Sequence, residues 1–149
     1  MKGRAMSDDY EKEVLRRTLE HERGTWREDL RTRFAPWFDQ LLWGFRCHDG
    51  WSGIITELTE EIARIVGGPE GAPDLRVVEV KEKLGGLRYY IWHVPEKHAL
   101  AVAEAKQRAE ERSFETCEVC GEPGKLVQSS GYWHTACPEH EDPASFRGG

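Results

Sequence analysis

Two pairs of residues with metal-binding side chains lie in the last third of this 149-residue chain, and they restrict its fold more than any other feature. The segment CEVCGEPGKLVQSSGYWHTACPEH contains Cys-x2-Cys, then sixteen residues, then Cys-x2-His. A two-residue gap lets both side chains of a pair reach one ion from a tight turn, and zinc takes four such ligands in a tetrahedron. We therefore predict one structural zinc ion, bound by Cys117, Cys120, Cys137 and His140.

The fourth ligand has an alternative in His134, three residues before Cys137. We favour His140, because its separation from Cys137 repeats that of the first pair. The intervening KLVQSSGYW predicts two short strands joined at Ser130-Gly131, as in a zinc ribbon. Three thiolates and one imidazole leave no position for water or substrate, so we expect the metal to be structural.

The predicted ribbon is also the most acidic part of the chain. Residues 113–149 carry six acidic and two basic side chains, so they contribute −4 to a total of −6. Three thiolates and one divalent ion add −1 and bring this segment to −5. Ribbons that bind nucleic acid surround the metal with Lys and Arg, because phosphate contacts dominate affinity. The charge therefore argues against nucleic-acid binding by the ribbon.

The whole chain predicts an α+β fold, with N-terminal helices, a central β-hairpin packed on helices, and a small C-terminal zinc ribbon. We divide it into a helical extension (1–36), an α+β body (37–113) with the hairpin at 75–94, the zinc-ribbon module (114–142) and a flexible tail (143–149). No apolar run is long enough to span a bilayer, and MKGRAMSDDYEKE lacks the apolar core of a secretory signal. We expect a cytoplasmic protein without membrane contact.

Two helices in the first half carry clear signals. Thr25 followed by Glu28 is a capping-box signature, which predicts a helix starting at Trp26. Apolar residues recur every three or four positions from Trp51 to Ile65, which predicts an amphipathic helix packed on the core. The segment between them, WFDQLLWGFRCHDGW, is the most apolar part of the chain. We expect its large apolar residues in the core: Trp37, Phe38, Leu41, Leu42, Trp43, Phe45 and Trp51.

The stretch DLRVVEVKEKLGGLRYYIWHVP predicts the β-hairpin. Gly85-Gly86 is placed at the turn, because tight hairpin turns need positive φ angles. Alternation divides the strands into two faces. One face holds Val78, Val80, Tyr89 and Ile91. The other holds Val77, Glu79, Lys81, Lys83, Arg88, Tyr90 and Trp92.

Five residues of the second face form what we call the basic-aromatic face: Lys81, Lys83, Arg88, Tyr90 and Trp92. Such a face suits an acidic patch on a protein or a nucleic-acid strand. The alternative, which we favour, is a solvated face whose aromatic rings are covered by helices and whose cations prevent edge pairing. We keep both interpretations.

Catalytic signals are weak. Cys47–His48–Asp49 suggests a nucleophile and its base, but neighbours in sequence seldom face each other, and Cys47 is better explained as packing. We therefore expect no enzymatic activity.

Three motifs together, WGFRCHDGW, VKEKLGGLRYY and CEVCG with its Cys-x2-His, resemble an uncharacterised family of small bacteriophage and prophage proteins. The resemblance covers residues 41–140. His48 departs from the small residue of that pattern, and Leu84 replaces its commoner Phe. The resemblance implies an accessory factor that binds and inhibits another protein. We expect a non-enzymatic zinc protein with a protein partner; the alternatives are nucleic-acid binding by the basic-aromatic face and an enzyme using Cys47, His48 and Asp49.

Overall fold

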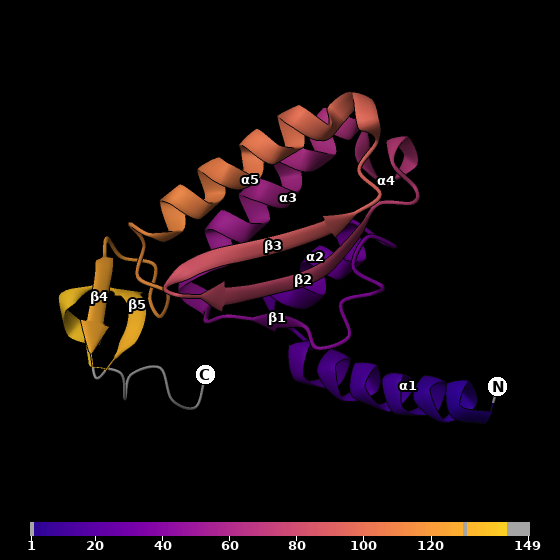
Figure 1. The fold of residues 1–149 in the computed structure, drawn as a ribbon, viewed down its shortest axis with the longest axis horizontal. Helices are drawn as coiled ribbons and strands as arrows, with labels where there is room; N and C mark the ends of the chain where they lie inside the picture. The colour runs from indigo at the N-terminus through magenta and orange to yellow at the C-terminus, as the bar shows by residue number, and fades with distance from the viewer. Residues whose placement is uncertain (1, 130, 143–149) are drawn as a thin grey trace.

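The computed structural model describes residues 2–129 and 131–142 (Figure 1). The predicted flexible tail, 143–149, lies outside the described residues. The helices are α1 (Lys2–Glu22), α2 (Trp26–Arg33), α3 (Ser52–Val66), α4 (Gly68–Gly71) and α5 (Ala99–Ser113). The strands are β1 (Phe45–Arg46), β2 (Arg76–Lys83), β3 (Gly86–Trp92), β4 (Lys125–Ser129) and β5 (Tyr132–Ala136). The predicted α+β fold class is confirmed.

The body is a three-stranded sheet with the helices α3 and α5 side by side against it (Figure 1). β2 and β3 form the antiparallel hairpin, and β1 adds to β2 in parallel. The amphipathic helix is confirmed, since α3 buries Ile54, Ile55, Leu58 and Ile62. Helix and sheet are also joined by a buried hydrogen bond, 2.8 Å long, between the side-chain oxygens of Thr59 and Tyr89.

The hairpin turn lies one residue earlier than predicted. Lys83 pairs with Gly86, so the turn residues are Leu84 (φ 53°) and Gly85 (φ 86°). Gly86 serves a different purpose, because a Cβ atom there would overlap the Phe114 ring. Packing against a residue beyond α5 thus accounts for this glycine, and Leu84 adopts the positive φ instead.

The predicted alternation of the hairpin is wrong at Val77. An irregularity in the register between Val77 and Glu79 shifts the pleat, and Val77 is fully buried rather than on the second face. Its backbone N–H donates to the Trp37 carbonyl at 2.8 Å. Val80 and Tyr89, on the other side of the irregularity, are buried as predicted.

Trp43 does not belong to the core, although the other predicted aromatic residues of its segment do. Trp37, Phe38, Phe45 and Trp51 are buried, whereas Trp43 is 61% exposed. The chain turns at Gly44, whose φ is 74°, and Phe45 then enters the sheet as part of β1. This turn leaves Trp43 on the outside.

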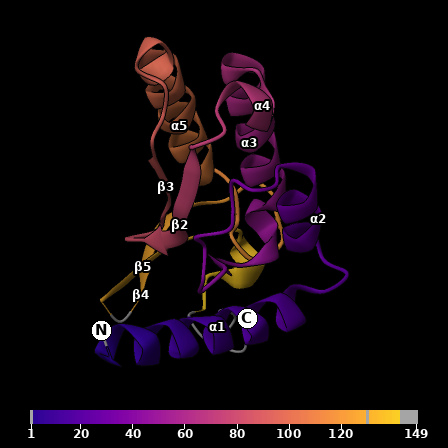
Figure 2. The ribbon, with the colours of Figure 1, turned by 90° about the vertical axis from the view of Figure 1, so that its right-hand side faces the viewer.

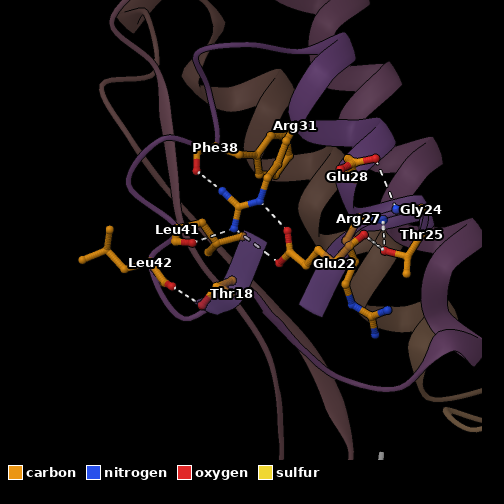
Figure 3. A network of polar contacts seen from close by, with 10 residues as sticks. All are labelled: Thr18, Glu22, Gly24, Thr25, Arg27, Glu28, Arg31, Phe38, Leu41 and Leu42. Atoms are coloured by element: carbon orange, nitrogen blue, oxygen red, sulfur yellow. Dashed lines mark hydrogen bonds and ion pairs between the residues drawn. The ribbon is translucent and has the colours of Figure 1, made fainter. Parts of the chain in front are cut away.

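The C-terminal half of α1 is fixed to the body by a buried ion pair (Figure 3). The Glu22 side chain, 2% exposed, accepts from Arg31 Nε at 2.5 Å. Arg31 also donates to the carbonyls of Phe38 (2.8 Å) and Leu41 (2.7 Å). Figure 2 shows α1 lying along the opposite end of the molecule from α3 and α5. The polar network therefore attaches this helix to the loop that follows α2.

α2 starts at Trp26 as predicted, and its capping contacts appear in Figure 3. The Thr25 hydroxyl accepts from the Arg27 N–H at 3.2 Å. The Glu28 carboxylate accepts from the Gly24 N–H rather than from the Thr25 N–H. The helix contributes Leu30 to the main core, so that core includes side chains before residue 36.

None of the helices in residues 2–129 and 131–142 is long and apolar enough to cross a membrane.

Candidate metal centre

The structure brings the four predicted ligands Cys117, Cys120, Cys137 and His140 together, with all four ligand atoms within 4.8 Å of one another. Cys120 Sγ lies 3.7 Å from Cys137 Sγ. His140 Nδ1 lies 3.6 Å from Cys117 Sγ and 3.2 Å from Cys137 Sγ. Sulfurs about 2.3 Å from a tetrahedral ion are separated by about 3.8 Å. These four residues can therefore hold one metal ion through three sulfurs and Nδ1.

Each ligand pair lies on a tight turn. The Gly121 N–H donates to the Cys117 carbonyl at 2.9 Å, and Gly121 has a φ of 82°, which a glycine adopts without strain. In the second pair, the His140 N–H donates to the Cys137 carbonyl at 3.0 Å. Both turns point two side chains in the same direction, as the two-residue spacing predicts.

The ribbon between the pairs brings one turn beside the other. β4 and β5 pair antiparallel, from Lys125 opposite Ala136 to Ser129 opposite Tyr132. Because Ala136 precedes Cys137, this pairing places the second turn next to the segment that leaves the first. The predicted two-stranded ribbon is confirmed.

His134 lies apart from the metal-binding group, whose histidine is His140. The His134 side chain is 1% exposed, and its Nε2 donates to the Glu141 carbonyl at 2.8 Å. This hydrogen bond connects β5 to the chain after His140. His134 therefore has a structural contact of its own within the ribbon.

Crowding of the sulfurs favours a bound cation. Burial alone raises the pKa of Cys117, but N–H groups of Cys137, Cys120 and Val119 outweigh it and lower that pKa to about 7. The Glu122 N–H lowers the pKa of Cys120, yet burial and the neighbouring thiols raise it to about 11. Ionisation of one thiol thus disfavours ionisation of its neighbour, and a divalent cation removes that repulsion.

The metal centre is joined to the body through the loop that precedes α3. The Gly50 N–H donates to the Glu118 carbonyl at 2.7 Å, and the His48 N–H donates to the Glu118 carboxylate at 3.1 Å. The Trp51 indole N–H donates to the Thr116 carbonyl at 3.0 Å. Our sequence analysis missed this junction. The one residue of the sequence that reflects this junction is Gly50. Its φ is not positive, but a side chain there would overlap the backbone of Cys117 and Glu118.

Burial raises the pKa of the Glu118 carboxyl above its ordinary value. The pKa of its carboxyl is raised to about 7, first by burial, against the opposing hydrogen bond from the His48 N–H. Repulsion from the Glu82 carboxylate raises it further.

The hairpin turn makes a second contact with the ribbon. Thr135, on β5, donates its hydroxyl proton to the Gly85 carbonyl at 2.7 Å. Leu126 of β4 lies so close to Gly85 that a side chain there would overlap it. The ribbon is therefore held against both the loop before α3 and the tip of the hairpin.

The register keeps the basic-aromatic face on one side of the hairpin, with Lys81 opposite Arg88. Two of its cations are ion-paired, Lys81 with Glu79 at 3.4 Å and Arg88 with Glu110 of α5. Its aromatic side chains are open, since Tyr90 is 39% and Trp92 58% exposed. A binding role for this face stays a prediction.

The surroundings of Cys47 and Asp49 weigh against a nucleophile with its base, and the expected lack of enzymatic activity stays a prediction. Burial, with a contribution from Glu118, raises the pKa of Cys47 to about 12. The Asp49 carboxylate accepts from the Trp26 indole (3.0 Å) and Arg27 (2.9 Å), which lower its pKa. The Asp49 carboxylate thus binds two side chains of α2.

No known protein family, curated protein or solved structure was found to match this chain.

Proposed function

We propose that this protein is a non-enzymatic zinc protein that acts by binding a protein partner. The observation that carries the proposal is the complete Cys3His set, with its ligand atoms within 4.8 Å, seated on the body. Thiolate and imidazole ligands at tetrahedral spacing are those that structural zinc takes. A catalytic zinc keeps one position for water, whereas here the protein supplies all four ligands.

Zinc has a structural role in this proposal. Glu118 lies between Cys117 and Cys120 and receives hydrogen bonds from the loop before α3 through both its carbonyl and its carboxylate. An ion that fixes the turn of the first ligand pair also fixes those contacts. The metal would therefore stabilise the junction of ribbon and body.

A protein partner with a basic surface fits the charge of the chain. The total is −6, and most of it lies in the ribbon. Complementary charge accelerates association and selects the partner. The resemblance to phage and prophage proteins favours, as partner, a host enzyme with a basic nucleic-acid channel, which this protein would inhibit.

Nucleic-acid binding is the second candidate, favoured by the open rings of Tyr90 and Trp92. The ion pairs of Lys81 and Arg88 weigh against it, because phosphate contacts need available cations. An enzyme based on Cys47 is disfavoured by the raised pKa of its thiol.

Metal analysis tests the first half of the proposal. Purified protein should contain about one equivalent of zinc, as one closed site implies. Cys120→Ser should lose the metal, and Cys47→Ala, which changes the cysteine outside the metal-binding group, should retain it. Folded protein that holds no zinc, or zinc retained by Cys120→Ser, would contradict a structural zinc site.

Capture from nuclease-treated extract of the source organism, followed by reconstitution from purified components, tests the second half. A protein partner should remain bound after nuclease treatment, and native mass spectrometry should show the complex. Nucleic-acid binding predicts affinity that falls steeply between low and moderate salt. Binding of nucleic acid alone, weakened by Trp92→Ala, would replace the proposal with its alternative.

A further inference from the structure

A groove of about 280 Å³ lies between the strand β3 and the helix α5. Figure 1 shows the helix lying along this strand. Four consecutive residues of β3 and two residues of α5, one helical turn apart, line the groove: Leu87, Arg88, Tyr89, Tyr90, Lys106 and Glu110. Successive residues of a strand point to opposite faces, so side chains of both faces of β3 contribute to the lining. The groove therefore follows the edge of the sheet.

β3 is an edge strand, since β2 is its neighbour on one side and no strand of the described residues lies on the other. The Leu87 N–H donates to Ser113 Oγ of α5 at 2.9 Å, so this residue directs its backbone groups away from β2. The register irregularity of the hairpin leaves β3 itself regular. Alternate residues share one direction, so Tyr89 and Ile91 also direct their N–H and C=O groups away from β2.

α5 covers only the first part of this edge. Its Ser113 accepts from the Leu87 N–H, and Arg88 donates to the Leu87 carbonyl at 3.4 Å. Arg88 is also ion-paired with Glu110 of the helix. Beyond these contacts, the described part of the chain contains no hydrogen bond or ion pair between α5 and residues 89–92. The outward groups of Tyr89 and Ile91 are thus those to which a further strand can add.

Lys106 is a cation of the groove that forms no ion pair with the described residues. Its side chain is half-buried, which lowers its pKa, whereas the Glu110 carboxylate raises that pKa. The same carboxylate is already ion-paired with Arg88. Two cations and one carboxylate are the charged side chains of the lining, so their sum is +1. The groove therefore favours an anionic group over a cationic one.

We propose that the groove binds a short extended segment of a protein partner, which adds to the edge of β3 and places a carboxylate beside Lys106. An extended backbone offers the alternating donors and acceptors that pair with Tyr89 and Ile91. The volume lies below the roughly 300–1,000 Å³ of small-molecule sites, which favours a segment with short side chains. The Tyr90 ring, on one face of β3 and 39% exposed, would pack against a residue of the added strand.

The inference deepens the proposed function and rests on it for the existence of the protein partner. Charge distinguishes the two surfaces, because the ribbon segment carries −4 and the lining of the groove +1. One partner would therefore direct its basic surface to the ribbon and an acidic segment to the groove.

Nuclear magnetic resonance of the zinc-loaded full chain tests the groove, with the peptide acetyl-TVEVT-amide as the probe. Its β-branched residues favour an extended conformation. Saturable shifts are expected at the backbone amides of Tyr89 and Ile91. Hydrogen exchange at these amides should slow about fivefold or more, because each gains an acceptor. The Leu87 amide, which already donates to Ser113, should keep its exchange rate.

Altered peptides separate the charge from the backbone. Acetyl-TVQVT-amide, which lacks the carboxylate, should bind about fivefold or more weakly. Alternate N–H groups of a strand point to opposite edges. N-methylation at both valines and N-methylation at the glutamate should therefore differ, one abolishing binding and the other leaving it intact.

Variants of the protein test the cation. Lys106→Met removes the charge and keeps an unbranched side chain, so it should weaken binding of TVEVT but leave binding of TVQVT unchanged. Lys97→Met is the matched control, since it removes an exposed cation just before α5 and outside the lining. It should bind both peptides like the unaltered protein. Thermal unfolding of both variants checks their fold.

Two outcomes would overturn strand addition: no saturable shift at the amides of Tyr89 and Ile91, and equal loss of binding from both N-methylated peptides. Equal binding of TVEVT and TVQVT would overturn the choice of an acidic segment. Tighter binding of hexathymidylate than of TVEVT, with shifts at the same amides, would assign the groove to nucleic acid instead.

The capture experiment separates this inference from the proposed function. A protein partner held equally by Lys106→Met and by the unaltered chain, with no binding of TVEVT, removes the groove inference and leaves the function. Binding of TVEVT that depends on Lys106, without any protein partner, removes the function and leaves a groove for acidic extended peptides.

Discussion

The backbone N–H of Gly50 donates to the carbonyl of Glu118 at 2.7 Å, which joins the loop before α3 to the turn that carries the first two metal ligands. A Cβ atom at Gly50 would overlap the carbonyl oxygens of Cys117 and Glu118. The metal centre and the body are therefore coupled by contacts between backbone atoms. A change of side-chain rotamer cannot relieve an overlap there. This coupling underlies the first two predictions.

Gly50→Ala should destabilise the protein by about 1–3 kcal/mol, because the added methyl group must push two backbone segments apart. Gly53→Ala is the matched control, since a Cβ there meets nothing within 4 Å. Gly53 lies in α3, where alanine should stabilise by about 0.5–1 kcal/mol. Chemical denaturation of both zinc-loaded variants measures the difference, and equal stabilities would show that the junction is not tightly packed.

Metal removal should loosen the junction before it unfolds the body. A chelator frees Cys117 and Cys120, so the hydrogen bonds from Gly50 and His48 to Glu118 should open. Amide hydrogen exchange of Gly50 and His48 should become much faster, whereas the Val80 amide in the sheet should change little. Unchanged protection at Gly50 after complete zinc loss would separate the junction from the metal.

Glu22→Ala should cost about 3 kcal/mol or more of unfolding free energy, because it leaves Arg31, only 11% exposed, without its carboxylate. Glu13→Ala is the comparison, since Glu13 pairs with Arg16 on the exposed surface of the same helix. That substitution should change stability little. Urea denaturation measures both, and a small effect of Glu22→Ala would show that the carbonyls of Phe38 and Leu41 suffice for Arg31.

Cys47 should react slowly with iodoacetamide in the zinc-loaded protein. With its pKa raised to about 12, its thiolate fraction at pH 8 is roughly a thousandfold below that of an ordinary cysteine. Mass spectrometry of the alkylated protein should show a rate that rises about tenfold per pH unit. Rapid modification at pH 8 would revive Cys47 as a nucleophile.

The same thiol makes stability depend on pH. Its pKa is higher in the folded than in the unfolded state, so the stabilising contribution is complete below the ordinary value near 8.5 and is lost as pH rises toward 12. The unaltered protein should therefore lose more stability than Cys47→Ala between about pH 9 and 11. Parallel stability curves for the two proteins would contradict the raised pKa.

Local features of the sequence were sufficient for α2, α3 and the four residues that can hold the metal ion. The two-residue spacing of Cys117–Cys120 and Cys137–His140 fixes how each pair can reach an ion, and the structure brings all four together. The cap at Thr25 and the periodicity of α3 also depend on neighbours within one helical turn. Such properties are readable because contact follows from spacing alone.

Tertiary contacts decided the rest. Gly86 packs on Phe114 while the turn lies at Leu84-Gly85, and the register irregularity accompanies the burial of Val77. The hydrogen bond from His48 to Glu118 joins residues 70 positions apart. Spacing and periodicity do not show which distant segments of backbone will lie beside each other. The junction and the groove between β3 and α5 therefore form only when the chain packs.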